Sequence, residues 1–400
     1  MSGGEDGRFG PSSFRANDAD LADAAHLWKS AYVHIPFCAH RCPYCDFAIV
    51  DESVEGNGDH QRYVDAVVRE IEMETSFGPL DAVNFGGGTP SLLSPGRLEE
   101  IVGALRRRFG FHSHTEVSLE VNPEDWATGT GENLRSAGFT RVSVGAQNFD
   151  EKILEALGRR HGADAGAEAV CSARAAGFRT VSIDLIYGHP TETARSWAGS
   201  LDRALDLPID HISTYSLTVE RGTALSREIL AGSTPPNEDI QAQRYETFCE
   251  QSSVAGFDRY EVSNHARPGH ACVYNLSTWA HGEYLGFGLG AHDHRWGTRA
   301  RNHQRLDRYF DAIDAGIRPR LGLEHLDADC QERDRFMLGL RLAAGTPMSE
   351  FAARFLSRPE GERLLESGLI VATRDRLVVT QPMLTDAVAR EALSVSSHDC

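Results

Sequence analysis

The sequence lacks the features that would place the chain in a membrane or outside the cell. None of its apolar runs approaches the roughly 20 residues that a membrane-spanning helix needs. The N-terminus has no apolar core of the kind found in secretory signals. Residues 1–27 are rich in Gly, Ser, Asp and Ala, and they are expected to form a disordered leader. These features predict a cytoplasmic protein.

Positive charge is scarce relative to negative charge. The 400 residues include 40 Lys and Arg against 58 Asp and Glu, which gives a formal net charge of -18. An acidic chain repels phosphate backbones, and no nucleic-acid-binding module is recognisable. Nucleic acid is therefore not expected as a partner.

The eight cysteines are not arranged like a disulfide framework. Five are scattered and are expected to be thiols in a reducing compartment: Cys171, Cys249, Cys272, Cys330 and Cys400. The other three lie within "AYVHIPFCAHRCPYCDFAIV" in a C-x3-C-x2-C pattern: Cys38, Cys42 and Cys45. A disulfide uses two cysteines and a closed zinc site uses four ligands, so three cysteines suggest another kind of site.

Three thiolates can hold three irons of a [4Fe–4S] cluster and leave the fourth iron open. A ligand with both an amine and a carboxylate, such as the methionine end of S-adenosylmethionine, could chelate that iron. Two alternatives fit the spacing as well. The cysteines could form a zinc site together with His34 or His40. Cys42 and Cys45 could also form a redox pair.

Six apolar segments alternate with expected helices between Ser30 and Val219. The segments are "YVHI", "AVNF", "EVSLEV", "RVSVG", "VSIDLIYG" and "HISTYSL". Helices are expected near residues 62–76, 95–108, 132–137, 151–157, 163–176 and 193–205, with Ser94 as a cap of the second one. This alternation predicts a parallel sheet, in which the residues that follow the strands meet at one rim. The three cysteines follow the first strand and should lie at that rim.

The alternation weakens after Val219, and the pattern changes again near residue 326. A helix is expected over residues 240–255 and a strand with a turn at "RYEVSNHA". In the tail, "RFMLGLRLA" has helical periodicity and "LIVATRDRLVV" is typical of a hairpin. The expected domains are an α/β barrel core over residues 28–222, an extension over 223–325 and a small helix-plus-wing domain over 326–400.

The cysteine spacing, with aromatic Tyr44 before the last cysteine, resembles the signature of the radical S-adenosylmethionine superfamily. The longer string "YVHIPFCAHRCPYCDF" resembles the oxygen-independent coproporphyrinogen III oxidase family, and within it the heme chaperone branch, HemW. The resemblance extends from Tyr32 to the tail. It implies a partial (β/α)6 barrel with a small winged-helix-like, HemN-like α+β domain. It also implies a [4Fe–4S] cluster on the three cysteines and S-adenosylmethionine as a second cofactor.

Polar and glycine residues after the strands are candidates for contact with that cofactor. "FGGGTPS" follows the second strand, where glycines allow close approach of the backbone to a ligand. The resemblance implies a set of cofactor residues: Tyr32, Tyr44, Gly87, Gly88, Thr89, Glu120, Gln147, Arg159 and Asp184. Without the resemblance, a structural role would explain each of them better. Asp184 lies within an apolar strand, so it needs a partner to stay ionised.

Two departures from the family patterns bear on function. The oxidases carry a further cysteine two residues after the third ligand, whereas this chain and the chaperone branch have Phe47 in "CDF". The chaperones carry an H-N-x-x-Y element for heme, and the matching stretch here is "CVYNLSTW", with Tyr274 in place of His and Thr278 in place of Tyr. Cys272 or Tyr274 could replace the missing ligand. The candidate heme residues are Cys272, Tyr274 and Asn275.

The expected function is therefore that of a heme chaperone. Such a protein would bind heme and deliver it to a client heme protein, including a client reached at a membrane surface. The first alternative is the oxidative decarboxylation of coproporphyrinogen III through a 5′-deoxyadenosyl radical. Two further alternatives are a radical enzyme that modifies RNA and a zinc-binding interaction protein.

Overall fold

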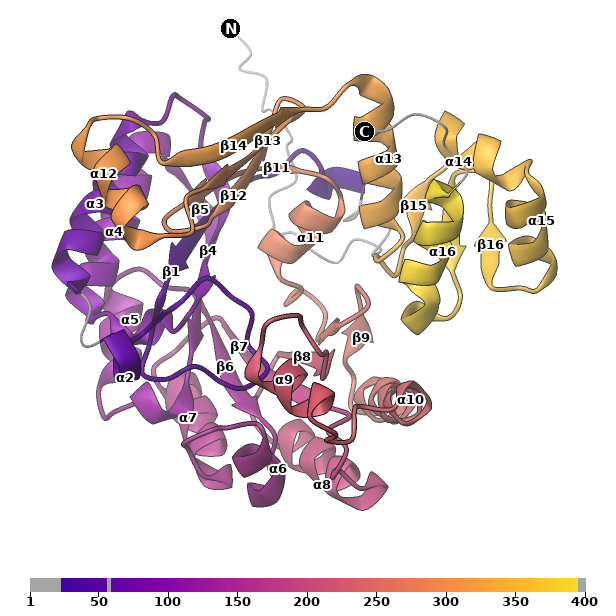
Figure 1. Ribbon diagram of the computed structural model, residues 1–400, viewed down its shortest axis with the longest axis horizontal. Coiled ribbons are helices and arrows are strands. Elements are labelled where there is room, and N and C mark those ends of the chain that lie inside the picture. The colour runs from indigo at the N-terminus through magenta and orange to yellow at the C-terminus, as the bar shows by residue number, and fades with distance from the viewer. Residues whose placement is uncertain (1–22, 56–58, 395–400) are drawn as a thin grey trace, which may run out of the picture.

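A twelve-stranded sheet forms the centre of the computed structural model, which describes residues 23–55 and 59–394 (Figure 1). Six of its strands lie side by side in chain order and run parallel. They are β1 (Lys29–Ile35), β4 (Leu80–Gly87), β5 (Phe111–Val121), β6 (Arg141–Gln147), β7 (Thr180–Tyr187) and β8 (His211–Ser216). The α/β class and the six strands expected from the sequence are confirmed.

Helices between these strands cover the outside of the curved sheet (Figure 1). They are α3 (His60–Met73), α4 (Pro95–Phe109), α5 (Thr130–Ser136), α6 (Glu151–Ala156), α7 (Ala163–Ala175) and α8 (Ala194–Leu205). The sequence predicts each of them to within a few residues. Ser94 occupies the N-cap of α4, but its side chain makes no cap hydrogen bond, so the expectation for that side chain is wrong. In contrast, α8 begins with a reciprocal capping box between Thr193 and Ser196.

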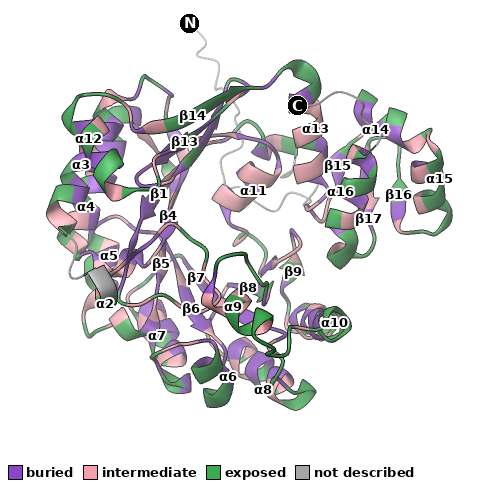
Figure 2. Cartoon of the chain, in the orientation of Figure 1, coloured by how far each residue is buried: buried purple, intermediate pink, exposed green. Residues whose placement is uncertain are grey.

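Alternation along the strands separates an apolar outer face from a polar interior. Strand β7 is mostly buried (Figure 2). Its residues Val181, Ile183 and Leu185 are fully buried within the main hydrophobic core. Ser182 and Asp184 lie between them in the sequence and therefore point to the other side of the sheet. The interior of the barrel is thus lined by groups that need hydrogen-bond partners or a polar ligand.

Strands from later in the chain extend the sheet at both edges. Next to β1 lie β11 (Glu283–Phe287), β12 (His292–Arg295), β13 (Thr298–Asn302) and β14 (Arg320–His325). Next to β8 lie β10 (Asn264–Ala266) and β9 (Asp258–Arg259). The connecting helices are α9 (Ala224–Leu230), α10 (Glu238–Val254), α11 (Val273–Trp279) and α12 (Leu306–Asp314). The pairing of β11 with β1 was not predicted, because no local pattern marks a partner about 250 residues away.

The C-terminal region has a hydrophobic cluster of its own. A three-stranded sheet in the order β15 (Thr346–Pro347), β17 (Arg376–Val379) and β16 (Ile370–Ala372) packs with helices. These helices are α13 (Ala328–Gly339), α14 (Glu350–Leu356), α15 (Pro359–Glu366) and α16 (Thr385–Leu393). The predicted hairpin is confirmed as the antiparallel pair of β16 and β17. The domain limits remain predictions.

The N-terminal segment and the scattered cysteines complete this description. Residues 1–22 of the expected leader lie outside the described residues, whereas Ala25 is fully buried in a cluster with Trp28 and Cys272. Of the scattered cysteines in the described part, Cys171, Cys249 and Cys272 are thiols, as expected. Cys330 is disulfide-bonded, so the thiol prediction is wrong at that position. Within the described ranges, no helix combines the length and apolarity that crossing a bilayer requires.

A buried carboxylate joins the extension to the barrel. Glu70, on α3, accepts hydrogen bonds from the Gly288 amide (2.8 Å), the Tyr309 hydroxyl (2.7 Å) and the Asn302 amide (2.6 Å). Burial raises the pKa of Glu70 to about 7. The Glu70 carboxylate is therefore the common acceptor for hydrogen-bond donors from three segments of the extension.

We expect Glu70→Ala to lower the free energy of unfolding by about 3 kcal/mol, because the Gly288 amide and the Tyr309 hydroxyl lose their buried acceptor and the Asn302 amide keeps only the Gly288 carbonyl. Thermal or urea unfolding measures this loss. Glu72→Ala, at an exposed position of the same helix, serves as the control and should have little effect. Equal stability of the two variants would contradict this role of Glu70.

Candidate functional site

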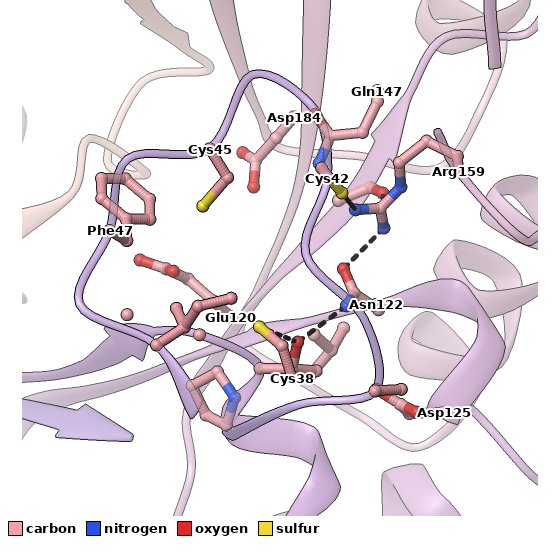
Figure 3. Close-up of a pocket in the computed structure, with 18 of the residues that line it drawn as sticks. Cys38, Cys42, Cys45, Phe47, Glu120, Asn122, Asp125, Gln147, Arg159 and Asp184 are labelled. Carbon is pink, nitrogen blue, oxygen red and sulfur yellow. Dashed lines mark hydrogen bonds between the residues drawn. The ribbon is translucent and has the colours of Figure 1, made fainter. Parts of the chain in front are cut away.

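A cavity of about 340 Å³ opens at the carboxyl ends of the parallel strands (Figure 3). Its size falls in the range of roughly 300 to 1,000 Å³ that is typical of small-ligand sites. All three clustered cysteines line it, together with most of the predicted cofactor residues: Tyr44, Gly87, Gly88, Thr89, Glu120, Gln147, Arg159 and Asp184. Tyr32 is not among the lining residues.

The cysteine loop is closed by backbone interactions at its base. The short strands β2 (Phe37–Cys38) and β3 (Val50–Asp51) pair in parallel, and the Val50 amide donates to the Pro36 carbonyl (2.8 Å). The helix α2 (Glu52–Glu55) follows β3. Within the loop, the Arg41 guanidinium donates to the carbonyls of Cys45, Phe47 and Ile49 at 3.3, 3.1 and 3.4 Å. These hydrogen bonds between protein groups hold the shape of the loop.

The His34 side chain supports the cysteine loop from the barrel side. Its Nε2 lies 2.8 Å from the Ala48 carbonyl oxygen, and its Nδ1 lies 3.1 Å from the Tyr32 hydroxyl. Its ring fills the space beside Gly87, where a Cβ would come within 2.5 Å of the ring. Burial lowers the pKa of His34, which keeps the imidazole neutral. Sequence reasoning considered His34 only as a zinc ligand and missed this supporting role.

The geometry fits a multi-iron cluster better than a zinc ion. Both ring nitrogens of His34 already contact protein oxygens, and Nε2 of His40 contacts the Gly158 carbonyl at 2.7 Å. In the part of the chain that the structure describes, no three His, Cys, Asp or Glu side chains lie close enough together for one metal ion. Thiolates of a cubane cluster each bind a different iron, so they are spaced more widely. Figure 3 shows the three sulfur atoms around one common space.

Two of the three thiols, Cys38 and Cys45, are held in surroundings that disfavour their charged form. Burial raises the pKa of Cys38 to about 11, and burial also raises the pKa of Cys45. The Cys38 sulfur lies 3.4 Å from the Thr89 hydroxyl, and Arg159 donates to the Cys42 sulfur at 3.6 Å. Binding of a metal would therefore release protons from these thiols.

Asn122 connects two of the predicted residues across the cavity. Its amide nitrogen donates to the Thr89 hydroxyl (3.0 Å), and its amide oxygen accepts from Arg159 (2.7 Å). This orients the guanidinium toward the cavity. Asn122 was missed as a site residue, although it lies in "SLEVNP", directly after the third strand. Its position at a strand end was the signal that could have identified it.

Two carboxylates form the floor of the cavity. Burial raises the pKa of Glu120 to about 7, and the neighbouring charge of Asp184 adds to this shift. Burial also raises the pKa of Asp184, which accepts a hydrogen bond from the Ser143 hydroxyl at 2.8 Å. A Cβ at position 86 would lie 2.6 Å from the Glu120 carboxylate, so a larger residue there would displace this carboxylate. A cationic group near both carboxylates would relieve their repulsion.

The candidate heme residues lie away from this cavity. Cys272 is the N-cap of α11 and is buried, which raises its pKa to about 12. The Asn275 amide donates to the Tyr260 hydroxyl (3.3 Å). Tyr274 stacks on Tyr32, with ring centroids 6.1 Å apart. Since Tyr32 contacts His34, this stack links α11 to the cysteine loop.

Comparison with known proteins agrees with this geometry. The radical SAM superfamily model matches residues 32–204. A heme chaperone HemW from Mycobacterium tuberculosis is 38% identical over 370 residues, which cover 90% of this chain and 94% of the relative. The chain belongs to the HemW family. HemW from Bacillus subtilis is 33% identical, over 88% of this chain and 95% of the relative.

The fold of this HemW-family chain is similar to that of a related enzyme. The solved structure of coproporphyrinogen III oxidase HemN from Escherichia coli, a radical SAM enzyme, superimposes with a TM-score of 0.78. It covers 96% of this chain and 93% of the enzyme at 22% sequence identity. This likeness confirms the predicted fold class, and the HemW relatives confirm the predicted family.

Proposed function

We propose that the chain is a radical SAM heme chaperone. It holds a [4Fe–4S] cluster on Cys38, Cys42 and Cys45, binds S-adenosylmethionine in the adjoining cavity, and delivers heme to client proteins. The observation that carries this proposal is the gathering of three thiols and eight predicted cofactor residues around one cavity. The chain that forms it is 38% identical to a protein named heme chaperone HemW.

The charges around the cavity suit the charged groups of S-adenosylmethionine, which are its carboxylate, its amine and its sulfonium. Arg159, held by Asn122, matches the carboxylate of the methionine end. Glu120 and Asp184 match a positively charged group. The cluster, when bound, would supply an open iron for chelation and one reducing electron. Gly87 and Gly88 let the backbone approach the ligand closely.

An apolar rim at the cavity mouth supports heme binding there. Phe47 is 60% exposed and Tyr215 is 45% exposed, although both are large aromatic residues. Such rings stack well on a planar porphyrin. Cys272 and Tyr274 suit heme less well, because the Cys272 side chain is buried and the Tyr274 ring is stacked on Tyr32. We therefore place heme at the rim and keep α11 as the second candidate location.

We propose the cytoplasm as the compartment and a heme protein, free or at a membrane surface, as the client. Six of the described cysteines are free thiols, which agrees with a reducing environment, whereas the disulfide at Cys330 does not. The alternative of a coproporphyrinogen III oxidase predicts decarboxylated product and 5′-deoxyadenosine. We expect neither product when coproporphyrinogen III is supplied to the cluster-loaded protein.

The affinity for S-adenosylmethionine should fall as the pH is lowered through about 7. Glu120, with its pKa of about 7, becomes protonated there and loses the charge that attracts a cationic ligand. Glu120→Gln should bind about tenfold more weakly at pH 8 and lose most of the pH dependence. Anaerobic calorimetry with the cluster-loaded protein measures both effects. Glu99→Gln, at an exposed position of α4, is the control. A pH profile of Glu120→Gln identical to that of the unaltered protein would reject this role.

An anaerobic hemin titration of the cluster-loaded protein tests the proposed function. We expect saturable binding near one equivalent and transfer of the bound heme to apomyoglobin. Phe47→Ser should weaken binding about tenfold through loss of aromatic contact, whereas Cys272→Ala with Tyr274→Phe should leave it unchanged. Loss of binding only in the double variant would move the site to α11. Unsaturable binding by the unaltered protein would reject the chaperone function.

A further inference from the structure

An exposed arginine of the cysteine loop keeps an unbalanced positive charge. Arg41 is exposed, and its guanidinium donates to the backbone carbonyl oxygens of Cys45, Phe47 and Ile49. These carbonyls satisfy N–H donors, but they carry no charge that would neutralise the guanidinium. A charged donor binds a carboxylate more strongly than it binds a neutral oxygen, so Arg41 can still bind an anion.

The nearby carboxylate of Asp51 does not fill this role. It accepts a hydrogen bond from the backbone amide of Arg41 (3.1 Å) and another from the Ser53 hydroxyl (2.6 Å). Among the residues that the structure describes, no carboxylate lies within ion-pair distance of the Arg41 guanidinium. The charge is therefore free for a ligand from outside the chain.

The three carbonyl contacts leave one edge of the guanidinium unused. Arginine has five N–H donors, one on Nε and two on each of Nη1 and Nη2. In Arg41, Nη1 donates to the carbonyls of Cys45 and Phe47, and Nη2 donates to the carbonyl of Ile49. The Nε donor and one Nη2 donor remain. They lie on the same edge of the planar group, and such an edge matches the two oxygens of a carboxylate.

The guanidinium lies beside the aromatic rim and outside the cavity. The residues Cys45, Phe47 and Ile49 line the cavity, whereas Arg41 is not among its lining residues. Arg41 Nη1 lies 3.1 Å from the carbonyl oxygen of Phe47, whose side chain belongs to the exposed rim. An exposed ring next to a cation with a free edge suits an aromatic acid, because the ring can stack while the carboxylate binds the cation.

We propose that Arg41 binds a propionate group of heme while the porphyrin stacks on Phe47. The proposal rests on the proposed function, which places heme at this rim. The two propionate oxygens accept hydrogen bonds from Nε and Nη2 of Arg41, and the three carbonyl contacts that hold the cysteine loop are kept. The rim thereby selects porphyrins that carry carboxylate side chains over neutral porphyrins.

A second arginine separates this site from the site of the small cofactor. Arg159 lines the cavity, and its side chain is only 6% exposed. Asn122 holds its guanidinium at 2.7 Å, in the place that suits the carboxylate of S-adenosylmethionine. The buried arginine thus matches the cofactor inside the cavity, and the exposed arginine matches the carboxylate of a larger ligand at the rim.

A comparison of two iron porphyrins tests the proposal on the unaltered, cluster-loaded protein. Hemin and its dimethyl ester share the ring and the iron, but the ester lacks both carboxylates. We expect hemin to bind about tenfold more tightly than the ester in anaerobic titrations under the same solvent conditions. Equal affinities would overturn the role of Arg41 and leave the chaperone function intact. Absence of saturable binding of hemin would reject both.

Arg41→Gln tests whether this residue is the source of the selectivity. The variant should bind hemin about tenfold more weakly and bind the dimethyl ester as the unaltered protein does. Because Arg41 also holds the cysteine loop, an equal loss for both ligands would indicate damage to the loop and would overturn the proposal.

Arg160→Gln is the matched control for this variant. Arg160 is exposed and follows a segment that contacts the cysteine loop, since the Gly158 carbonyl lies 2.7 Å from His40 Nε2. The substitution removes the same charge near the loop without removing any contact to residues 45–49. We expect the affinity for hemin to stay nearly unchanged. A loss as large as that of Arg41→Gln would indicate general charge attraction and would overturn the proposed contact.

Discussion

The site depends on the attachment of the cysteine loop to the end of β1. The pairing of β2 with β3 closes the loop, and the contact between His34 Nε2 and the Ala48 carbonyl supports it from the barrel side. A buried neutral imidazole can hold this contact over the whole physiological pH range. The cysteine sulfurs are thereby positioned over the strand ends, where Asn122 and Arg159 complete the wall of the cavity. Without this attachment, the thiols and the carboxylates would not share one space.

Several kinds of chemical group share this mouth of the barrel. The carboxylates Glu120 and Asp184, which suit a cation, line the same cavity as the three thiols (Figure 3). The rim carries Phe47 and Tyr215, which suit a planar apolar ligand. We therefore propose that one mouth binds a small charged cofactor inside and a porphyrin at its edge. Tyr274 on α11 stacks on Tyr32, and the Tyr32 hydroxyl contacts His34, which supports the cysteine loop. The second candidate location for heme, at α11, is therefore connected to the cysteine loop.

The sequence predicted those parts of the structure that local patterns determine. The six strands and their helices could be predicted because apolar segments alternate with helical patterns. The cysteine cluster could be predicted because the three cysteines lie within eight residues of one another. The pairing of β11 with β1 could not be predicted, because it joins distant segments through backbone hydrogen bonds that leave no local sequence pattern. The helix α11 was missed because its residues were considered only as heme ligands. Asn122 and His34 were missed because their roles come from contacts across the sheet.

We propose that the three thiols hold a cluster with one iron open to a ligand. Mössbauer spectroscopy of protein reconstituted anaerobically with 57Fe and sulfide can test this arrangement. We expect about four iron atoms per chain, with about one quarter of the signal shifting when S-adenosylmethionine is added. Zinc without sulfide in the purified protein, or an iron spectrum that S-adenosylmethionine does not change, would contradict it.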